Sequence, residues 1–114
     1  MADYLALTID VADGELQSAF WCGALDYEQR FVANQFRGLF PREGVGVQLT
    51  LQQVAEPKTA KSRMHLDLHV PDVEAEAGRL VSLGATRVKQ VQQFEMTWVI
   101  MLDPEGNEFC VVPS

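Results

Sequence analysis

The sequence has few cysteines, no long apolar run and a shortage of basic residues. Its two cysteines, Cys22 and Cys110, match no zinc-binding spacing, and a chain of 114 residues can bury a core without disulfides. No apolar run approaches the roughly 20 residues of a membrane span, and the N-terminus lacks the basic and apolar segments of a signal peptide. We therefore expect a cytoplasmic protein that keeps its thiols reduced and does not bind membranes.

Basic residues number nine against sixteen acidic ones, which gives a formal net charge of −7. Proteins that bind nucleic acid by neutralising phosphates need the opposite sign or a clear basic face. The local basic cluster, made of Lys58, Lys61 and Arg63, is interpreted as part of a solvated loop. The charge balance thus predicts no nucleic-acid partner.

A polar segment, AEPKTAKSR at residues 55–63, separates two more apolar halves and is typical of a connector. The chain has the length of one domain, and the connector is short for a link between independent domains. We therefore expect a single domain, residues 1–114, in which a first module (about 4–54) and a second module (about 64–113) share a core.

The first module begins with alternating apolar and polar residues at 5–11, which predict a strand. Asp13 then has the residue type of a helix N-cap. Apolar residues recur after it at helical spacing: Leu16, Phe20 and Ala24. These features predict a helix at 14–25, followed by two short strands and a longer strand at about 45–54.

The second module repeats this order. HLDLHV predicts a strand at 65–70, Asp72 is a second N-cap, and Gly84 is typical of a helix C-terminus, so we expect a helix at 73–83. A type I turn is expected at DPEG, residues 103–106. Three strands fit the remaining pattern: about 86–92, 97–102 and 108–112. The predicted order is βαβββ twice, which is an α+β fold.

Strand alternation assigns many polar residues to one face of each sheet. The apolar residues of the strand at 65–70 must pack beneath a helix, which leaves His65, Asp67 and His69 on the opposite face. We expect that face to line a cavity and to supply the residues that contact a ligand: Thr8, Gln48, Thr50, His65, Asp67, His69, Trp98, Glu108 and Cys110.

The run EPKTAKSRMHLDLHVPDVEAEAGRLVSLGATRV, followed by DPEGNEFCVV, resembles the glyoxalase / bleomycin-resistance / dioxygenase superfamily, also called vicinal oxygen chelate proteins. It is most similar to the glyoxalase-like domain branch. The likeness covers nearly the whole chain, is strongest over 56–113, and departs at Asp26, where the family usually has glycine. It implies two βαβββ modules that form a U-shaped curved mixed sheet around a cavity, helices outside, in a homodimer that binds a small molecule.

Enzymes of this superfamily usually hold a divalent metal. The resemblance places the four ligand positions on Ala6, Gln48, His65 and Cys110. Only His65 keeps the usual residue type, because alanine has no donor atom, glutamine is a poor ligand, and one His with one thiol is a weak set. We therefore predict no metal and no other cofactor. A shifted site with Asp67 stays open, but it could use only one of His65 and His69, which are about 13 Å apart along the strand.

Each candidate also has a plainer interpretation. His65 can hydrogen-bond across the sheet instead of touching a ligand, and His69 can be solvated at the strand end. Glu108 is either an exposed side chain or a general base. Cys110 can be an inert wall residue, since no basic partner adjoins it in sequence.

Three functions are compatible with these patterns. The first is a metal-independent small-molecule-binding protein of the glyoxalase/bleomycin-resistance type. The second is a lyase, isomerase or dioxygenase-type enzyme that uses a metal or acid–base groups near His65 and Glu108. The third is a regulatory or structural dimer with a vestigial pocket. Fold alone does not choose among them, and we favour the first because the metal positions are poorly filled.

Overall fold

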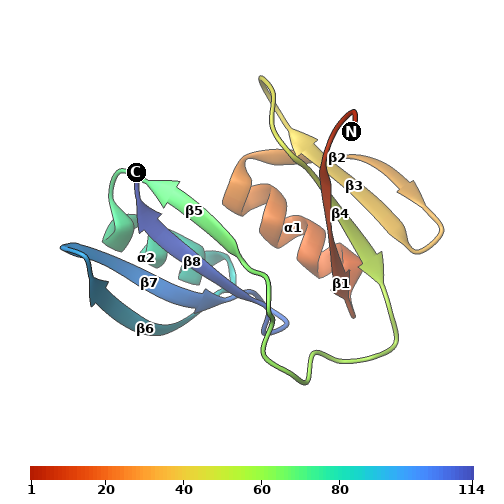
Figure 1. The fold of residues 1–114 in the computed structure, drawn as a ribbon. Coiled ribbons are helices and arrows are strands. Elements are labelled where there is room, and N and C mark those ends of the chain that lie inside the picture. The colour runs from red at the N-terminus through yellow and green to blue at the C-terminus, as the bar shows by residue number, and fades with distance from the viewer. The chain divides into compact units, whose positions relative to one another are not determined.

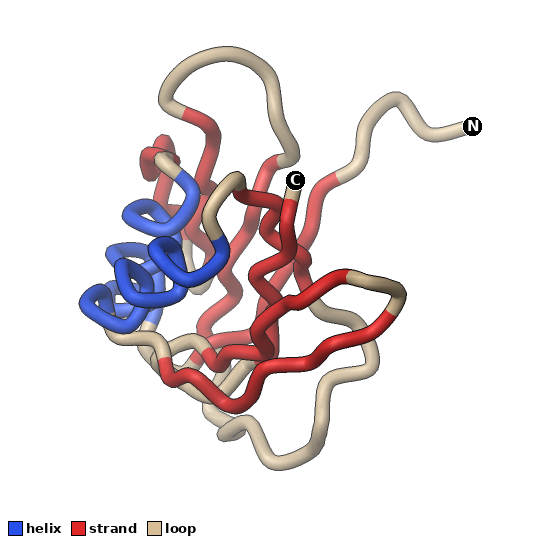
Figure 2. The backbone as a smooth tube through the Cα atoms, turned by 90° about the vertical axis from the view of Figure 1, so that its left-hand side faces the viewer, coloured by secondary structure: helices blue, strands red, loops and turns tan.

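Two βαβββ units make up the chain in the computed structural model, which describes residues 1–114. Unit one is Met1–Pro57 and unit two is Lys58–Ser114, so the boundary lies inside the expected connector. Within each unit, one helix covers one face of a four-stranded sheet (Figure 1, Figure 2). The predicted α+β fold with a repeated βαβββ order is confirmed.

Unit one forms its sheet in the order β1-β4-β3-β2, with β1 parallel to β4 and the other pairs antiparallel. Its elements are β1 (Ala6–Val11), α1 (Gly14–Leu25), β2 (Tyr27–Ala33), β3 (Phe36–Pro41) and β4 (Gln48–Gln53). β4 begins three residues later than the predicted start at Val45. Residues 45–47 follow the left-handed Gly44, whose φ is 76°, and lie outside the paired strand.

Unit two repeats the order as β5-β8-β7-β6, again with the first edge strand, β5, parallel to its neighbour β8 and the other pairs antiparallel. Its elements are β5 (Leu66–Val70), α2 (Val73–Leu83), β6 (Thr86–Gln93), β7 (Met96–Leu102) and β8 (Glu108–Pro113). The two units therefore share one topology. The joining of their sheets around one cavity stays a prediction.

Both helices begin at the predicted N-caps. Asp13 accepts a hydrogen bond from the Leu16 amide at 3.0 Å, and Asp72 accepts one from the Ala75 amide at 3.0 Å. Each bond satisfies a backbone donor that the first helical turn leaves without a partner. At its other end, α1 is capped by Asp26 with a φ of 56°, a left-handed conformation that glycine adopts more easily.

The core of each unit lies between its helix and its sheet. In unit two, Leu80 of α2 packs in the layer with buried strand residues, which are Val99, Met101, Phe109 and Val111. In unit one the predicted helix is present, but of its apolar residues at helical spacing Leu16 is 49% exposed, whereas Gln17 is fully buried. Because neighbouring helix residues differ by about 100° around the axis, turning Gln17 inward rotates Leu16 out to solvent.

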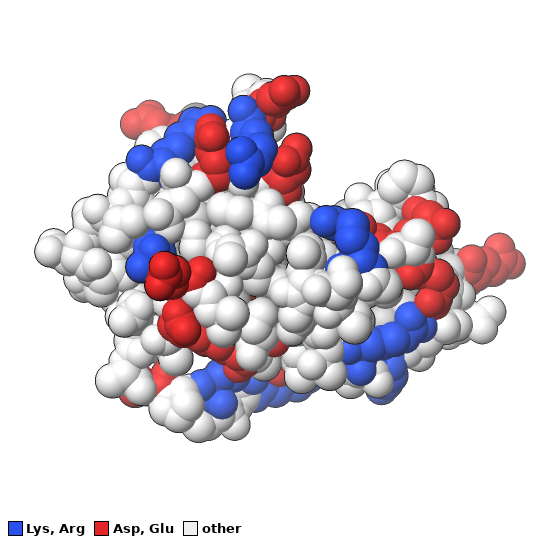
Figure 3. All heavy atoms as spheres, turned by 180° about the vertical axis from the view of Figure 1, so that it is seen from behind, with Lys and Arg blue, Asp and Glu red and all other residues white.

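Charged side chains of both signs mix on the surface. The face in Figure 3 carries small groups of basic and acidic residues side by side. Two ion pairs follow this pattern: Arg79–Glu76 within α2 at 2.6 Å, and Arg87 of β6 with Glu74 of α2 at 2.7 Å. The face shown thus differs from the continuous basic surface that phosphate recognition uses. Neither α1 nor α2 is long and apolar enough to cross a membrane.

The N-cap geometry predicts the effect of removing one carboxylate. Asp72→Ala should lower the free energy of unfolding by about 1 kcal/mol, because the Ala75 amide loses its acceptor. Asp72→Ser should retain most of the stability, since serine also accepts at an N-cap. Urea denaturation of the three proteins measures both effects, and equal midpoints for Asp72→Ala and the natural sequence would contradict the capping role.

Candidate functional site

The open face of unit two, which is the sheet face away from α2, carries most of the predicted site residues. Asp67 of β5 and Ile100 of β7 are both register partners of Cys110 in β8, and register partners share a face. The alternate residues, such as Phe109 and Val111, are buried in the core. The strand alternation expected from the sequence therefore holds, and it places polar residues on the open face.

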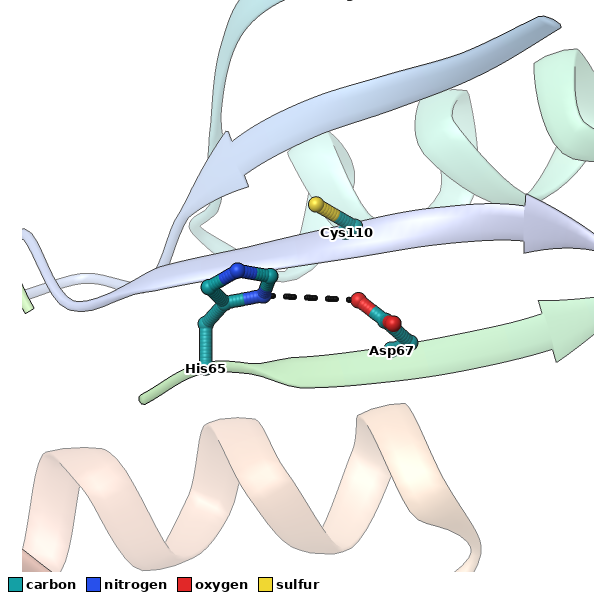
Figure 4. A group of neighbouring side chains, drawn as sticks. All are labelled: His65, Asp67 and Cys110. Carbon is teal, nitrogen blue, oxygen red and sulfur yellow. Dashed lines mark ion pairs between the residues drawn. The ribbon is translucent and has the colours of Figure 1, made fainter. Parts of the chain in front are cut away.

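His65, Asp67 and Cys110 form a close cluster on this face. Their possible ligand atoms all lie within 4.8 Å of one another, and His65 Nδ1 is 3.4 Å from Asp67 Oδ1. Figure 4 shows the three side chains converging from β8 and from the start of β5. The His65 and Asp67 side chains are 41% and 49% exposed, while Cys110 is buried beneath the surface.

The thiol of Cys110 is held in its protonated form. Burial raises its pKa first, and the negative charge of Asp67 and a hydrogen bond to that carboxylate raise it further. A thiolate is the reactive form of cysteine. Cys110 is therefore a poor nucleophile in this setting, in agreement with its interpretation as a wall residue.

His69 and Trp98 lie outside this cluster. His69 is exposed near the end of β5, and its Nδ1 is 3.4 Å from the carbonyl oxygen of Pro113. Trp98 is half-buried two residues before Ile100 in β7, on the same face. The structure thus brings together only three of the predicted ligand-contacting residues in unit two.

Glu108 binds the connector. Its Oε1 is 3.2 Å from Lys58 Nζ, and its Oε2 accepts a hydrogen bond from the Ser62 amide at 3.1 Å. Hydrogen bonds from Ser62, from the Glu108 amide and from Lys58 outweigh desolvation and lower the pKa of Glu108 to about 2. Such a carboxylate is a weak base, which argues against a general-base role.

Sequence reasoning missed the contribution of Lys58 and Ser62. Lys58 was assigned to a solvated loop, but its side chain is only 22% exposed and pairs with Glu108. No local signal could have identified this contact, because the partners are 50 and 46 residues apart in the chain.

The predicted site residues of unit one lie on its own open face, which is the sheet face away from α1. Thr8 and Thr50 are register partners, and Gln48 Nε2 donates a hydrogen bond to Thr50 Oγ1 at 3.0 Å. Ala6 is the register partner of Gln48. These residues offer hydroxyl and amide groups but no good metal donor.

The metal set that the resemblance implies does not fit this chain, because Ala6 has no donor and the Gln48 amide is engaged with Thr50. The cluster of His65, Asp67 and Cys110 does offer nitrogen, oxygen and sulfur donors, which are the donor types of zinc. Bonds of 2.0–2.3 Å to a tetrahedral ion would place these atoms about 3.3–3.8 Å apart. The cluster therefore needs only small side-chain movements to hold such an ion.

A match to a protein-family model identifies the family of this chain. The model of the glyoxalase-like domain matches residues 6–112. The chain belongs to the glyoxalase-like domain family. No curated protein is similar enough in sequence to count as a match.

Solved structures agree with this glyoxalase-like fold. A glyoxalase/bleomycin resistance protein/dioxygenase family enzyme from Burkholderia phytofirmans is 21% identical with a TM-score of 0.79, over 96% of this chain and 97% of that one. A variant of the fosfomycin resistance protein FosX from Listeria monocytogenes, complexed with Mn(II) and dihydroxypropylphosphonic acid, is 14% identical with a TM-score of 0.81, over 98% and 90%. At these identities the likeness concerns the fold.

The Glu108 anchor predicts how the stability of this glyoxalase-like domain depends on pH. Glu108→Gln should destabilise it by about 1 kcal/mol at neutral pH, because a charge-assisted contact becomes a neutral one. The folded-state pKa is lowered from 4.5 to about 2, so the stabilisation is complete above 4.5 and is lost as the pH falls toward 2. Thermal melts of both proteins across this range should converge at the acid end.

Glu43→Gln serves as the control, since Glu43 is an exposed carboxylate of unit one. Its melting temperature should follow that of the natural sequence at each pH. A constant difference between Glu108→Gln and the natural sequence from neutral to acid pH would contradict the proposed electrostatic anchor.

Proposed function

We propose that this glyoxalase-like domain binds a small molecule on the open face of unit two, without requiring a metal. The observation that carries the proposal is the half-exposed pair of His65 and Asp67 beside the buried Cys110, on a sheet face that also carries the half-buried Trp98. Small-molecule sites typically combine an apolar wall with a few polar groups that orient the ligand.

The chemistry of the neighbouring groups favours binding over catalysis. The raised pKa of Cys110 disfavours the thiolate, and the pKa of Glu108, about 2, makes that carboxylate a weak base. Bleomycin and fosfomycin resistance proteins occur among the similar structures. Their names support a small-molecule ligand for this chain as well.

A thermal-shift screen of metabolites and antibiotics tests the proposal. A ligand present at 100 times its Kd stabilises a protein by about 2.7 kcal/mol, so a true ligand raises the melting temperature measurably. Calorimetric titration of the hits should show weaker binding to His65→Gln and Asp67→Asn, by about tenfold each if a hydrogen bond to a charged group is lost.

His69→Gln is the matched control, because His69 lies on β5 and on the open face, as Asp67 does, but does not belong to the cluster. It should bind the hits as tightly as the natural sequence does. Equal affinity for all three variants would show that the ligand does not use His65 and Asp67.

A second candidate function is an enzyme whose metal is held by His65, Asp67 and Cys110. The separation of their donor atoms, within 4.8 Å, favours it. Bound there, a zinc-type ion would polarise a substrate oxygen or lower the pKa of a bound water. Cys110 would have to lose its proton on binding, so metal affinity would rise with pH.

Cobalt titration of chelator-treated protein separates the two candidates. If the cluster binds the ion, Co²⁺ should produce a thiolate charge-transfer absorption band that is lost in Cys110→Ser and weakened in Asp67→Asn. Cys22→Ser and His69→Gln should leave the band unchanged, since neither residue belongs to the cluster. Absence of the band from the natural sequence would remove the metal-dependent candidate and support metal-independent binding.

We also propose that the protein is a homodimer, because of its likeness to the family. A cytoplasmic location is proposed because both cysteines are free thiols, which need no oxidising compartment. Light scattering coupled to size-exclusion chromatography should give twice the chain mass of 12.7 kDa. A single-chain mass at micromolar concentration would contradict the dimer.

A further inference from the structure

The open face of unit one carries an exposed aromatic ring that lies against a glycine. Phe31 of β2 and Gly38 of β3 are register partners. A Cβ atom at Gly38 would lie only 2.0 Å from Phe31 Cε2 and 2.4 Å from Cζ. Phe31 nevertheless remains 41% exposed while Gly38 is buried. The ring therefore covers the glycine on one side and presents the rest of its surface to solvent.

A second ring adjoins Phe31, and a guanidinium group lies over that second ring. The ring centroids of Phe31 and Phe40 are 6.3 Å apart, and Arg30 Cζ lies 5.0 Å from the centroid of Phe40. A register shift in β2 between Gln29 and Phe31 marks a bulge at Arg30. Bulges often re-aim side chains at binding sites, and the guanidinium group of Arg30, the bulge residue, lies over the ring of Phe40.

The guanidinium group of Arg30 is held in place by two contacts, which do not use all of its hydrogen-bond donors. Its Nε is 3.1 Å from Glu28 Oε1, and its Nη2 donates to the carbonyl oxygen of Pro41 at 2.8 Å. None of the described hydrogen bonds uses Nη1, and the side chain is 48% exposed. Arg30 is thus held in place with donors left for an acceptor from solution.

Hydroxyl groups continue the same row of the sheet. The register runs from Phe31 to Gly38, then to Thr50 of β4 and Thr8 of β1. Across the sheet, the apolar surface of the Phe31 ring is therefore bordered by the two threonine hydroxyl groups. A surface one or two rings wide is far smaller than a stable protein interface, so it suits a small molecule.

We propose that this aromatic platform, made of Phe31, Phe40 and Arg30, binds a planar aromatic acid. A planar ring can stack on the exposed side of Phe31 in the offset arrangement that aromatic pairs prefer. The acid group can then accept hydrogen bonds from Arg30, whose planar donor geometry matches a carboxylate. The platform lies in unit one and involves none of the cluster residues of unit two, so the inference goes beyond the proposed function.

Two-dimensional NMR of the ¹⁵N-labelled chain, titrated with 2-naphthoate, tests the platform directly. Ring-current shifts should concentrate at the amides of Phe31, Gly38 and Thr50. Shifts confined to amides of unit two would overturn the platform while leaving the proposed function of that unit intact. A titration without any shifts at millimolar ligand would overturn it as well.

Gly38→Ala is the sharpest variant, because the added methyl group collides with the movable ring of Phe31 rather than with backbone. The ring should swing aside and the strand should stay paired. We expect Gly38→Ala and Phe31→Ala each to weaken 2-naphthoate binding about fivefold, the loss of one aromatic pair. Phe94→Ala, which removes an 87% exposed ring from unit two, should leave the affinity unchanged.

Gly38→Ala and Phe31→Ala each introduce alanine, which a strand can accommodate. The amide spectra of the two variants show directly whether unit one is folded. Unchanged affinity in folded Gly38→Ala and Phe31→Ala would overturn the stacking role. Weaker binding by Phe94→Ala of the same size would also overturn it, because it would show a non-specific apolar effect.

The role of Arg30 is tested by comparing an acid with its neutral amide. The natural sequence should bind 2-naphthoate more tightly than naphthalene-2-carboxamide, by about tenfold for a charge-assisted hydrogen bond. Arg30→Gln should remove this preference and leave carboxamide binding unchanged. An undiminished preference in Arg30→Gln would overturn the assignment of the acid group to Arg30.

Discussion

One helix covers only one face of a four-stranded sheet, and this constraint organises both units. In unit two, the strand residues beneath α2 are almost completely buried: Val99, Met101, Phe109 and Val111. Because successive strand residues point to opposite faces, the same packing directs Asp67 and Cys110 to the open face. Asp67 and Cys110 are therefore positioned by apolar residues that are their immediate neighbours in sequence.

The repeat supplies two copies of one frame, and substitutions give the two open faces different chemistry. Unit two carries an imidazole, a carboxylate and a thiol within 4.8 Å of one another. Unit one has paired threonines and a phenylalanine ring resting on Gly38. The frame is stable in both cases because its core residues lie on the other face, so the open face can vary without loss of packing.

The contacts of Glu108 change the chemical role that this carboxylate can have. Glu108 is a carboxylate at the start of β8, on the same face as Cys110, and from this position alone it could be taken for a general base. The Lys58 and Ser62 contacts instead lower its pKa to about 2 and use both carboxylate oxygens. The carboxylate thus fastens the connector to unit two.

The sequence by itself determined the element order, the N-caps at Asp13 and Asp72, and the face on which each strand residue lies. These features depend on residues within about four positions of one another, which a linear pattern records. Tertiary structure alone decided that Lys58 meets Glu108, that Phe31 lies against Gly38, and that Gln17 rather than Leu16 turns toward the core. Those outcomes arise from strand pairing and helix rotation, which bring together residues that no local pattern connects.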